Sequence, residues 1–303
     1  MSSATGDAAL PGAGRLPEWI RVPLPTGRYP EVRATLEELG LATVCREARC
    51  PNKSECWSAG TATFMLLGTD CTRRCGFCAV TTRWHHGAVD PTEPARLAQG
   101  VRRWGLRYVV LTQVCRDDLP DGGASVLAEA VRRLRAEAPT TRIELLAGDL
   151  GPNEDALAAL LREPPDVLAH NIETVPRLSP SVRDRRASYD RSLAFLARAR
   201  SLGPSNLVTK SSIMLGLGER EDELVATFRD LVAAGVDLLT LGQYLRPTPD
   251  HLAVERFVPP DEFDRLRAIA LSTGFAGVEA GPLVRSSYHA AELFASARRR
   301  RGG

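Results

Sequence analysis

Residues 63–78 read TFMLLGTDCTRRCGFC, an apolar segment followed by a short loop with three cysteines. The loop carries Cys71, Cys75 and Cys78, and three thiolates can hold three corners of a cubic iron–sulfur cluster, which four cysteines normally close. The fourth iron then has no protein ligand from this loop, so a small molecule can bind there. Because open metal positions are typical of chemistry and closed ones of structure, the stretch predicts an enzyme.

The apolar segment is the first of six short runs of this kind, each followed by an amphipathic helix pattern. The runs are apolar throughout rather than alternating, as in parallel strands covered on both faces. Six consecutive βα units predict a parallel α/β barrel or part of one, with the reactive face at the carboxyl ends of the strands. The predicted strands span residues 63–67, 108–114, 143–147, 167–172, 207–215 and 238–244, and the predicted helices span residues 93–104, 124–136, 154–162, 188–201, 219–234 and 261–272.

The composition is that of an ordinary folded protein, with 303 residues, 44% apolar and 25% charged. A net charge of +2 gives no reason to expect a nucleic-acid or membrane-surface partner. Residues 1–17 have no apolar core like that of a signal peptide, and no run of about 18 apolar residues could span a bilayer. We therefore expect a cytoplasmic protein, in which clustered cysteines bind metal more often than they form disulfides.

The predicted barrel covers residues 61–273 and has a segment on each side. Residues 1–15 and 298–303 are expected to be disordered ends. Residues 16–60 form an N-terminal segment that begins as a helix, and residues 274–297 form a C-terminal segment.

A second cysteine set lies in the N-terminal segment, where Cys45, Cys50 and Cys56 are spaced C-x4-C-x5-C. One interpretation is zinc held by ligands from both cysteine sets. Zinc prefers four ligands and commonly C-x2-C pairs, and the two sets contain one such pair, Cys75 and Cys78. The spacing therefore favours two iron–sulfur clusters over zinc.

The C-x3-C-x2-C loop after the first strand of a βα barrel resembles the radical S-adenosylmethionine (SAM) superfamily. Together with the upstream C-x4-C-x5-C set, the chain is similar to the lipoyl synthase family over roughly residues 16–290. Further motifs that carry the resemblance are LPTG at 24–27, EARCPN at 47–52, ECW at 55–57, GTATFM at 60–65, RDDLPDGG at 116–123, HNIETVP at 170–176, MLGLGE at 214–219, GQYL at 242–245 and RSSY at 285–288.

The resemblance implies a partial (β/α)6 TIM-type barrel of the radical SAM kind, with N- and C-terminal extensions that carry an auxiliary cluster. It implies two [4Fe–4S] clusters and SAM as cofactors. The implied reaction is sulfur insertion at C6 and C8 of an octanoyl group on a lysine of a lipoyl carrier domain, with the auxiliary cluster as sulfur donor. The implied partners are that octanoylated carrier, a low-potential electron donor of the flavodoxin or ferredoxin type, and an iron–sulfur carrier for cluster repair.

The same resemblance assigns the cluster ligands. Cys71, Cys75 and Cys78 would hold the SAM-binding cluster. The auxiliary cluster would be held by Cys45, Cys50 and Cys56, with Ser287 as its fourth ligand and Ser286 as the next choice. A serine oxygen is a harder ligand than a thiolate and suits this iron less well, so that iron would leave first. Without the resemblance, the serine pair is typical of an ordinary turn.

Other residues are candidates for contacts with SAM. Asn171 and Glu173 follow the fourth strand and would contact SAM or order the ends of their loop. Gly216 and Gly218 would approach the adenosine or form a plain βα turn. Arg285 is a candidate for a carboxylate of SAM or of the substrate.

Further polar residues have two interpretations each. Lys210 could bind a carboxylate or extend its ammonium to solvent from a strand end. His170 is more typical of a hydrogen-bonded core histidine than of a metal ligand. Asp117, Asp118 and Asp121 could hold substrate or order a loop.

Several positions depart from the family pattern, among them Gln113, Cys115, Gly148 and Ala169, and the stretch RWHHG at residues 83–87 also differs. The family usually reads Thr-Ser-Val-Asp where this chain has TQVC at residues 112–115, so Cys115 replaces an acid. Cys115 is either a small buried side chain or faces the active-site cavity. These departures leave open a related radical SAM sulfurtransferase that acts on a different carrier-bound or peptide substrate.

Overall fold

The computed structural model describes residues 16–22, 24–151 and 153–300, and its main sheet is a partial barrel. The sheet has eight strands in the order β1-β2-β5-β6-β7-β8-β9-β10, and all neighbours except β1 and β2 are parallel. The strands are β1 (Ala42–Thr43), β2 (Thr63–Leu66), β5 (Tyr108–Gln113), β6 (Arg142–Leu146), β7 (Val167–Ala169), β8 (Val208–Leu215), β9 (Leu238–Gln243) and β10 (Gly277–Gly281). The predicted partial barrel of parallel strands is confirmed.

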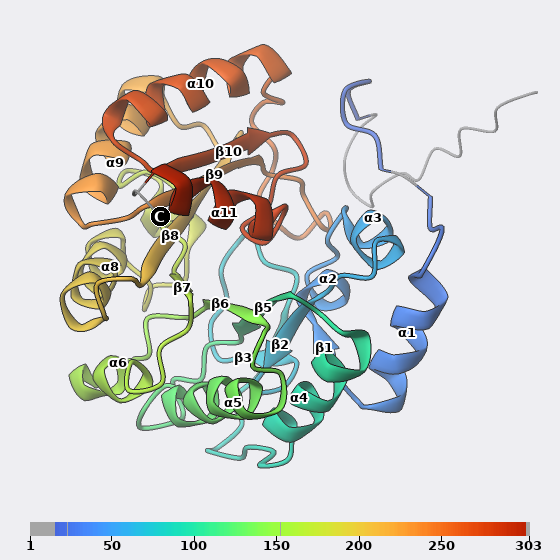
Figure 1. Cartoon of the computed structure of the whole chain (residues 1–303). Helices are drawn as coiled ribbons and strands as arrows, with labels where there is room; N and C mark the ends of the chain where they lie inside the picture. The colour runs from blue at the N-terminus through green and yellow to red at the C-terminus, as the bar shows by residue number, and fades with distance from the viewer. Residues whose placement is uncertain (1–15, 23, 152, 301–303) are drawn as a thin grey trace, which may run out of the picture.

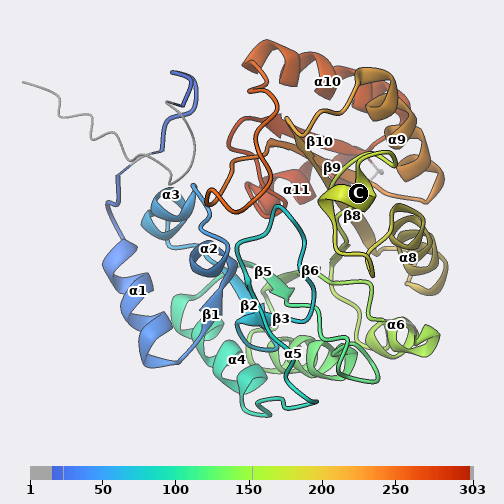
Figure 2. The same ribbon diagram turned by 180° about the vertical axis from the view of Figure 1, so that it is seen from behind.

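Six helices cover the outer face of the sheet (Figures 1 and 2). Each helix follows the strand after which the sequence predicts it. The helices form because apolar residues recur at helical spacing on the face that packs against the sheet. In α5, for example, Leu127, Val131 and Leu134 are fully buried. These helices are α4 (Glu93–Trp104), α5 (Ala124–Glu137), α6 (Glu154–Leu160), α8 (Tyr189–Leu202), α9 (Glu221–Ala233) and α10 (Pro260–Thr273).

Strand β8 shows how the two faces of the sheet differ. Its Ile213 and Leu215 pack in the apolar cluster that contains the α9 residue Leu224. Because side chains alternate along a strand, Ser212 and Met214 point to the opposite, inner face. The inner face is therefore more polar than the face under the helices.

The N-terminal segment lies beside β2 and folds into three short helices (Figure 1). They are α1 (Tyr29–Glu38), α2 (Val44–Glu47) and α3 (Lys53–Ser58). Three other small elements, β3 (Asp70–Cys71), β4 (Thr81–Thr82) and α7 (Ser179–Val182), lie in loops at the carboxyl ends of the strands.

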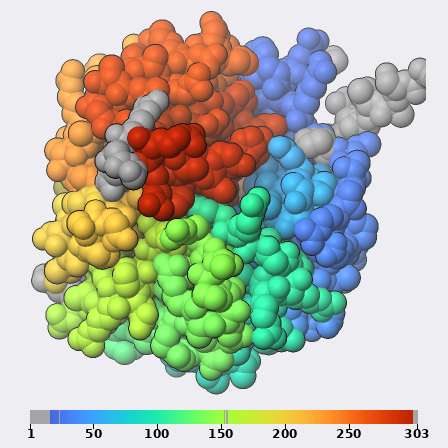
Figure 3. Space-filling view, in the orientation of Figure 1, coloured from blue at the N-terminus to red at the C-terminus, as the bar shows by residue number. Residues whose placement is uncertain are grey.

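The C-terminal segment is more structured than the sequence predicts. Strand β10 adds a seventh parallel strand, and helix α11 (Ala290–Arg300) follows it. Leu293 and Phe294 of α11 pack against the first residues of central strands, including Val208 and Leu238. The helix thus closes the amino end of the barrel, and Figures 1 and 3 show it across that face. The reactive face is the opposite end.

The expectation of a disordered tail from residue 298 is wrong for Arg298–Arg300, because α11 runs through Arg300. Residues 1–15 and 301–303, which were also expected to be disordered, lie outside the described residues. Within the described ranges, no helix is both long and apolar enough to cross a bilayer.

Candidate functional site

The first cysteine loop lies at the carboxyl ends of the strands, at the front of the view in Figure 2. Two other segments hold its backbone. Gly76 donates to the Val182 carbonyl over 2.9 Å and accepts from the amide of Leu252 over 3.1 Å. The His251 ring lies 3.1 Å from the carbonyl oxygen of Cys78. The loop is therefore fixed between the end of α7 and the segment after β9.

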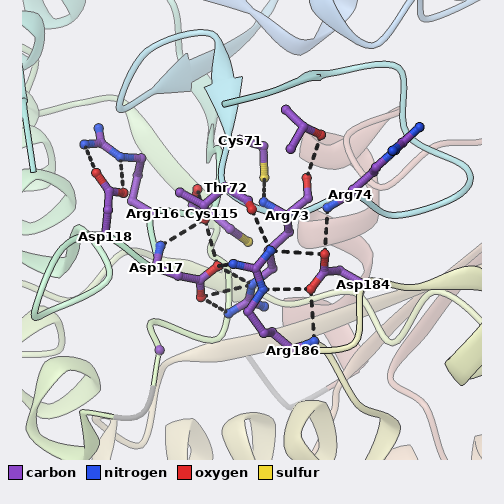
Figure 4. Close-up of polar contacts among 12 residues, drawn as sticks. Cys71, Thr72, Arg73, Arg74, Cys115, Arg116, Asp117, Asp118, Asp184 and Arg186 are labelled. Carbon is purple, nitrogen blue, oxygen red and sulfur yellow. Dashed lines mark hydrogen bonds and ion pairs between the residues drawn. The ribbon is translucent and has the colours of Figure 1, made fainter. Parts of the chain in front are cut away.

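Arg73, inside the loop, is its main electrostatic anchor. The guanidinium is buried and lies 2.7 Å from a carboxylate oxygen of both Asp117 and Asp149. These aspartates follow β5 and β6, so one arginine ties the loop to two strand ends. Arg186 adds a 2.6 Å hydrogen bond to the carbonyl oxygen of Thr72 (Figure 4). The position of the loop is thus set by the strand ends beneath it.

Each thiol of the loop accepts a hydrogen bond from a backbone amide. The amide of Arg73 lies 3.4 Å from Cys71 Sγ, and the amide of Asp184 lies 3.3 Å from Cys75 Sγ. Cys78 accepts from the amide of Val80. Amide donors favour the charged thiolate, which is the form that binds metal.

The thiols of this loop differ in acidity. Burial raises the pKa of Cys75 to about 11 and that of Cys78 to about 12. A hydrogen bond from the side chain of Cys115 lowers the pKa of Cys71 to about 7. Cysteines bind metal as thiolates, so binding of a metal cluster to this loop must release protons.

Cys115, the seventh cysteine, lies against Cys71. The hydrogen bond to Cys71 and burial raise the pKa of Cys115 well above its ordinary value. The two interpretations from the sequence, a small buried side chain and one that faces the active-site cavity, both stay predictions for Cys115. Figure 4 shows Cys115 below Cys71 and beside Arg73.

The second cysteine set is built from α2, α3 and the turn between them. Burial raises the pKa of Cys45 to about 11 and that of Cys56 to about 12, and it also raises the pKa of Cys50. The charges of Cys45 and Cys50 contribute to the shift at Cys56, so the three thiols lie close enough to interact. The structure therefore brings this predicted set together.

The C-terminal segment packs on the second cysteine set. Asn52 Nδ2 donates to the Leu283 carbonyl over 2.6 Å, and the Tyr288 hydroxyl donates to Glu55 over 3.0 Å. Ser286 and Ser287 occupy a turn between these two contacts. The contacts also join residues that follow β10 to residues that precede β2, across the open side of the barrel.

Arg285 lies beside this second set. Its guanidinium interacts electrostatically with Cys50, and burial lowers the pKa of Arg285. Its Nη1 donates to the Val284 carbonyl over 2.7 Å. The structure therefore associates Arg285 with the second cysteine set.

Asn171 and Glu173 lie near the first cysteine loop. The Glu173 charge contributes to the raised pKa values of Cys75 and Cys78, and Asn171 donates a hydrogen bond to Glu173. Asn171 Oδ1 is buried without a hydrogen-bond partner. A buried acceptor without a partner is costly unless a ligand supplies the donor.

The backbone of Glu173 is strained. Its φ of 69° lies in the left-handed region, which side chains rarely adopt. Two strand-like hydrogen bonds hold it there: its amide donates to Ser212 over 3.0 Å, and its carbonyl accepts from Met214 over 2.9 Å. Strain of this kind is concentrated at binding sites, where it points a side chain at a ligand.

Gly216 and Gly218 form a tight turn after β8, with φ values of 93° and 96°. The Gly216 amide donates to the Glu219 carboxylate over 2.7 Å. A Cβ at Gly216 would come within 2.2 Å of Gln243 Nε2. Close packing inside the protein thus accounts for Gly216.

Lys210 neither binds a ligand carboxylate nor extends to solvent, the two possibilities that the sequence left open. Its ammonium is buried inside the barrel, 2.8 Å from a carboxylate oxygen of Glu144. The Tyr108 hydroxyl donates to the other oxygen over 2.6 Å. Lys210 belongs to a closed network near the amino end of the strands, where the Glu144 carboxylate compensates its charge.

His170 is a core histidine, as expected. Its ring nitrogens lie 2.9 Å from the Ala147 carbonyl oxygen and 2.8 Å from the Ser192 hydroxyl, and burial lowers its pKa to about 4. The acidic residues after β5 order their loops: Asp118 pairs with Arg116 at 2.7 Å, and Asp121 accepts from the Gly123 amide over 2.9 Å.

Three residues around the first loop were missed from the sequence: Arg73, Asp149 and Asp184. Two adjacent arginines inside the cysteine loop could have indicated that Arg73 pairs with an acidic residue. Asp149 lies two residues after the end of a predicted strand, and an acid at such a position could have been assigned as the partner of Arg73. Asp184 carries no comparable signal, because its contact with the loop spans 109 residues of chain.

The donor sets fit iron–sulfur clusters better than zinc. Among the described residues, no three histidine, cysteine or acidic side chains converge on a single metal ion. A cubic cluster binds each thiolate through a different iron, so its ligands need no common point. Amide donors at the first set and the buried cation of Arg285 at the second also suit an anionic cluster.

Two family models match the chain. The model of the radical SAM superfamily matches residues 65–231, which is more than half of the chain. The model of the N-terminal domain of lipoyl synthase of the radical SAM family matches residues 9–50.

Curated relatives match nearly the whole chain. The lipoyl synthase of Thermus thermophilus is 54% identical over 285 residues, which cover 94% of this chain and 88% of the relative. The lipoyl synthase of Symbiobacterium thermophilum is 55% identical, with 95% and 90% covered. The mitochondrial lipoyl synthase of Candida tropicalis is 50% identical, with 92% and 75% covered.

Solved structures of low identity share the fold. HydG, a maturase of the [FeFe]-hydrogenase, aligns with a TM-score of 0.55 at 11% identity over 77% of this chain and 62% of its own. SuiB of Streptococcus suis, bound to SAM, aligns with a TM-score of 0.54 at 10% identity over 73% and 51%. These alignments show that the chain shares its fold with both proteins.

Proposed function

The chain belongs to the lipoyl synthase family of the radical SAM superfamily, and we propose which of its residues perform the reaction of that family. It is an enzyme that inserts sulfur into the octanoyl group of an octanoylated lipoyl carrier, at C6 and C8. Its cofactors are SAM and two [4Fe–4S] clusters. When bound, they supply hydrogen abstraction from unactivated carbon and the sulfur that is inserted.

Cys71, Cys75 and Cys78 are the ligands of the first cluster. The observation that supports this assignment is the backbone amide donor at each of the three sulfurs. Hydrogen bonds to the sulfurs tune such a cluster, and the buried ion pairs of Arg73 hold the loop in place for it.

Cys45, Cys50, Cys56 and Ser287 are the ligands of the auxiliary cluster. Residues 16–60 and 274–297, which flank residues 61–273, thus act together, and β10 of the second segment extends the sheet of the barrel. Leu283 and Tyr288, on either side of the serine pair, support this proposal through their hydrogen bonds to Asn52 and Glu55.

Asn171 and Glu173 bind the methionine part of SAM. The unpartnered Asn171 Oδ1 would accept from its ammonium group. Burial raises the pKa of Glu173, and a cation beside it would favour its charged form. The turn of Gly216 and Gly218 would present backbone to the adenosine. Arg285 would balance the negative charge of the auxiliary cluster. It would not bind the carboxylate of SAM, because it lies beside Cys50.

The remaining partners follow from the chemistry. A low-potential donor of the flavodoxin or ferredoxin type supplies electrons, and an iron–sulfur carrier rebuilds the auxiliary cluster after its sulfur is used. Because all seven cysteines are free thiols, we also propose a reducing compartment, the cytoplasm.

The decisive assay combines the anaerobically reconstituted protein with SAM, a low-potential reductant and an octanoylated carrier peptide. We expect a product heavier by two sulfur atoms, less two hydrogens once the ring disulfide closes. Formation of 5′-deoxyadenosine without thiolation of this peptide would contradict the substrate and point to a different carrier-bound or peptide substrate. A Cys50→Ala variant is the control, and it should cleave SAM without thiolating the peptide.

A further inference from the structure

Residues 81–90 follow the first cysteine loop and form a stretch of exposed chain, which we call the rim loop. Nine of its ten residues are exposed, among them two apolar side chains. Trp84 is 47% exposed and Val89 is 43% exposed. They flank a turn in which the Ala88 amide donates to the His85 carbonyl over 3.3 Å. Tryptophan on a surface is enriched at protein–protein contacts, so the rim loop is a candidate for one.

The rim loop begins beside the first cysteine loop, on the reactive face. Its first two residues are strand β4, which pairs in parallel with β3 so that Thr82 lies opposite Cys71. The Arg83 amide then donates to the Cys71 carbonyl over 2.9 Å. Trp84 therefore directly follows residues that are hydrogen-bonded to the start of the cysteine loop. In Figure 2 the chain runs from β3 along the lower edge of this face to the start of α4.

A buried ion pair fixes the turn of the rim loop. Arg116 and Asp118, both buried, pair at 2.7 Å. Arg116 also donates to the Ala88 carbonyl over 2.6 Å, and Asp118 accepts from the Gly87 amide over 2.8 Å. The backbone between the two exposed apolar side chains is thus held from below. A surface whose backbone is already ordered loses less conformational entropy when a partner binds.

Two exposed arginines come from the same part of the chain. The Arg83 side chain is 68% exposed, with its Nε 3.4 Å from a carboxylate oxygen of Asp70. Arg74 is exposed, and Figure 4 shows its guanidinium extending away from the other residues drawn. Positive charge of this kind attracts a partner that presents acidic side chains.

We propose that the rim loop, through Trp84 and Val89 and with Arg74 and Arg83, is the docking surface for the body of the octanoylated carrier domain. The inference rests on the proposed function, in which the octanoyl group enters the reactive face. Because that group is attached to a lysine of the carrier, the body of the carrier must lie against the rim of the same face. The carrier that fits presents acidic and apolar side chains around its modified lysine.

The test compares an intact octanoylated carrier domain with a short octanoyl-lysine peptide, using the holoenzyme and its variants. Trp84→Ala should raise the Kd for the intact domain, measured by calorimetry, by about tenfold. Its KM for the domain should rise with the Kd, whereas kcat and the KM for the peptide should stay at the wild-type values. Leu202→Ala is the matched control. Leu202 is 45% exposed and is the last residue of α8, which ends at the opposite, amino end of the barrel, so this change should alter neither constant.

Three results would overturn the proposal. They are equal Kd values for wild type and Trp84→Ala, a KM for the peptide that rises as much as the KM for the domain, and an equal loss of binding in Leu202→Ala. The calorimetric measurement is independent of catalysis, so it separates this inference from the proposed function. A chain that binds the intact domain through Trp84 but thiolates neither substrate would support the docking surface and contradict the proposed function.

Discussion

At the scale of single residues, the site depends on charges that are buried and paired. Arg73 lies between Asp117 and Asp149, Lys210 lies beside Glu144, and Arg285 lies beside Cys50. The sequence predicts the cysteines, because thiols at a fixed spacing are a local signal. It does not predict the partners of Lys210 or Arg285, since these contacts join residues far apart in the chain.

Replacement of Ser287 by cysteine should leave the clusters intact and slow sulfur transfer. A thiolate is a softer ligand than a serine oxygen and holds iron more firmly, so the auxiliary cluster opens less readily. We expect about eight irons per chain and a thiolation rate lower by about tenfold, which is about 1.4 kcal/mol in barrier. Iron analysis and single-turnover product formation measure both. Ser286→Cys is the matched control, and an equal effect there would refute the choice of Ser287.

Replacement of Arg73 by glutamine should destabilise the fold around the first loop. The buried Asp149 and the half-buried Asp117 lose their shared partner, and breaking a buried ion pair costs about 3–5 kcal/mol. Arg191 and Arg186 also lie near these carboxylates and compensate part of their charge. We therefore expect the free energy of unfolding to fall by about 3 kcal/mol. Urea unfolding measures the loss. The neighbouring Arg74 is exposed, and Arg74→Gln should leave the midpoint unchanged.

At the scale of the elements, the six predicted βα units are all present, and the errors lie at the end of the chain. Strand β10 reads GVEAG, and its two glycines and its glutamate have low strand propensity. It forms because β9 offers a parallel edge, which no local pattern reveals. Helix α11 was missed as an element because its apolar face matters only against the strand starts that it covers.

Helix α11 should contribute strongly to stability. Phe294 is 8% exposed and its ring centroid lies 5.9 Å from that of Tyr108, so Phe294→Ala opens a cavity at the amino end of the barrel. We expect a loss of about 3–5 kcal/mol in the free energy of unfolding. Ala295→Ser, on the exposed side of the same helix, is the control. Similar unfolding midpoints for the two variants would show that α11 does not close the barrel in solution.

The histidine after β7 should make stability depend on pH. Burial lowers the pKa of His170 from 6.5 to about 4, so the unfolded chain binds a proton that the folded chain does not. Stability from this group is therefore present above pH 6.5 and is lost as the pH falls towards 4, by up to about 3 kcal/mol.

The His170→Gln variant should lose this part of the pH dependence in thermal unfolding between pH 6.5 and 4. His86→Gln, at an exposed histidine, is the control and should keep the wild-type slope. An unchanged slope in His170→Gln would contradict a buried, neutral His170.

At the scale of the whole molecule, the two ends of the chain meet at the open side of the barrel. The N-terminal segment brings three cysteines, and the C-terminal segment brings the serine pair and Arg285 to the same place. The sequence resemblance implied this meeting, whereas periodicity and spacing alone did not, because no local pattern links residues more than 200 positions apart. The fold thus leaves the two cysteine sets on different supports, one on the barrel and one outside it.

The central claim is that these two sets have separate roles, with the set outside the barrel as the sulfur source. The most direct test is to reconstitute the protein with heavy-isotope sulfide, remove all free sulfide and run a single turnover on the octanoylated carrier peptide. We predict a product in which both inserted sulfurs are heavy, formed by the wild-type chain and absent with Cys50→Ala. A thiolated product that contains only light sulfur, or one that Cys50→Ala still forms, would contradict the account.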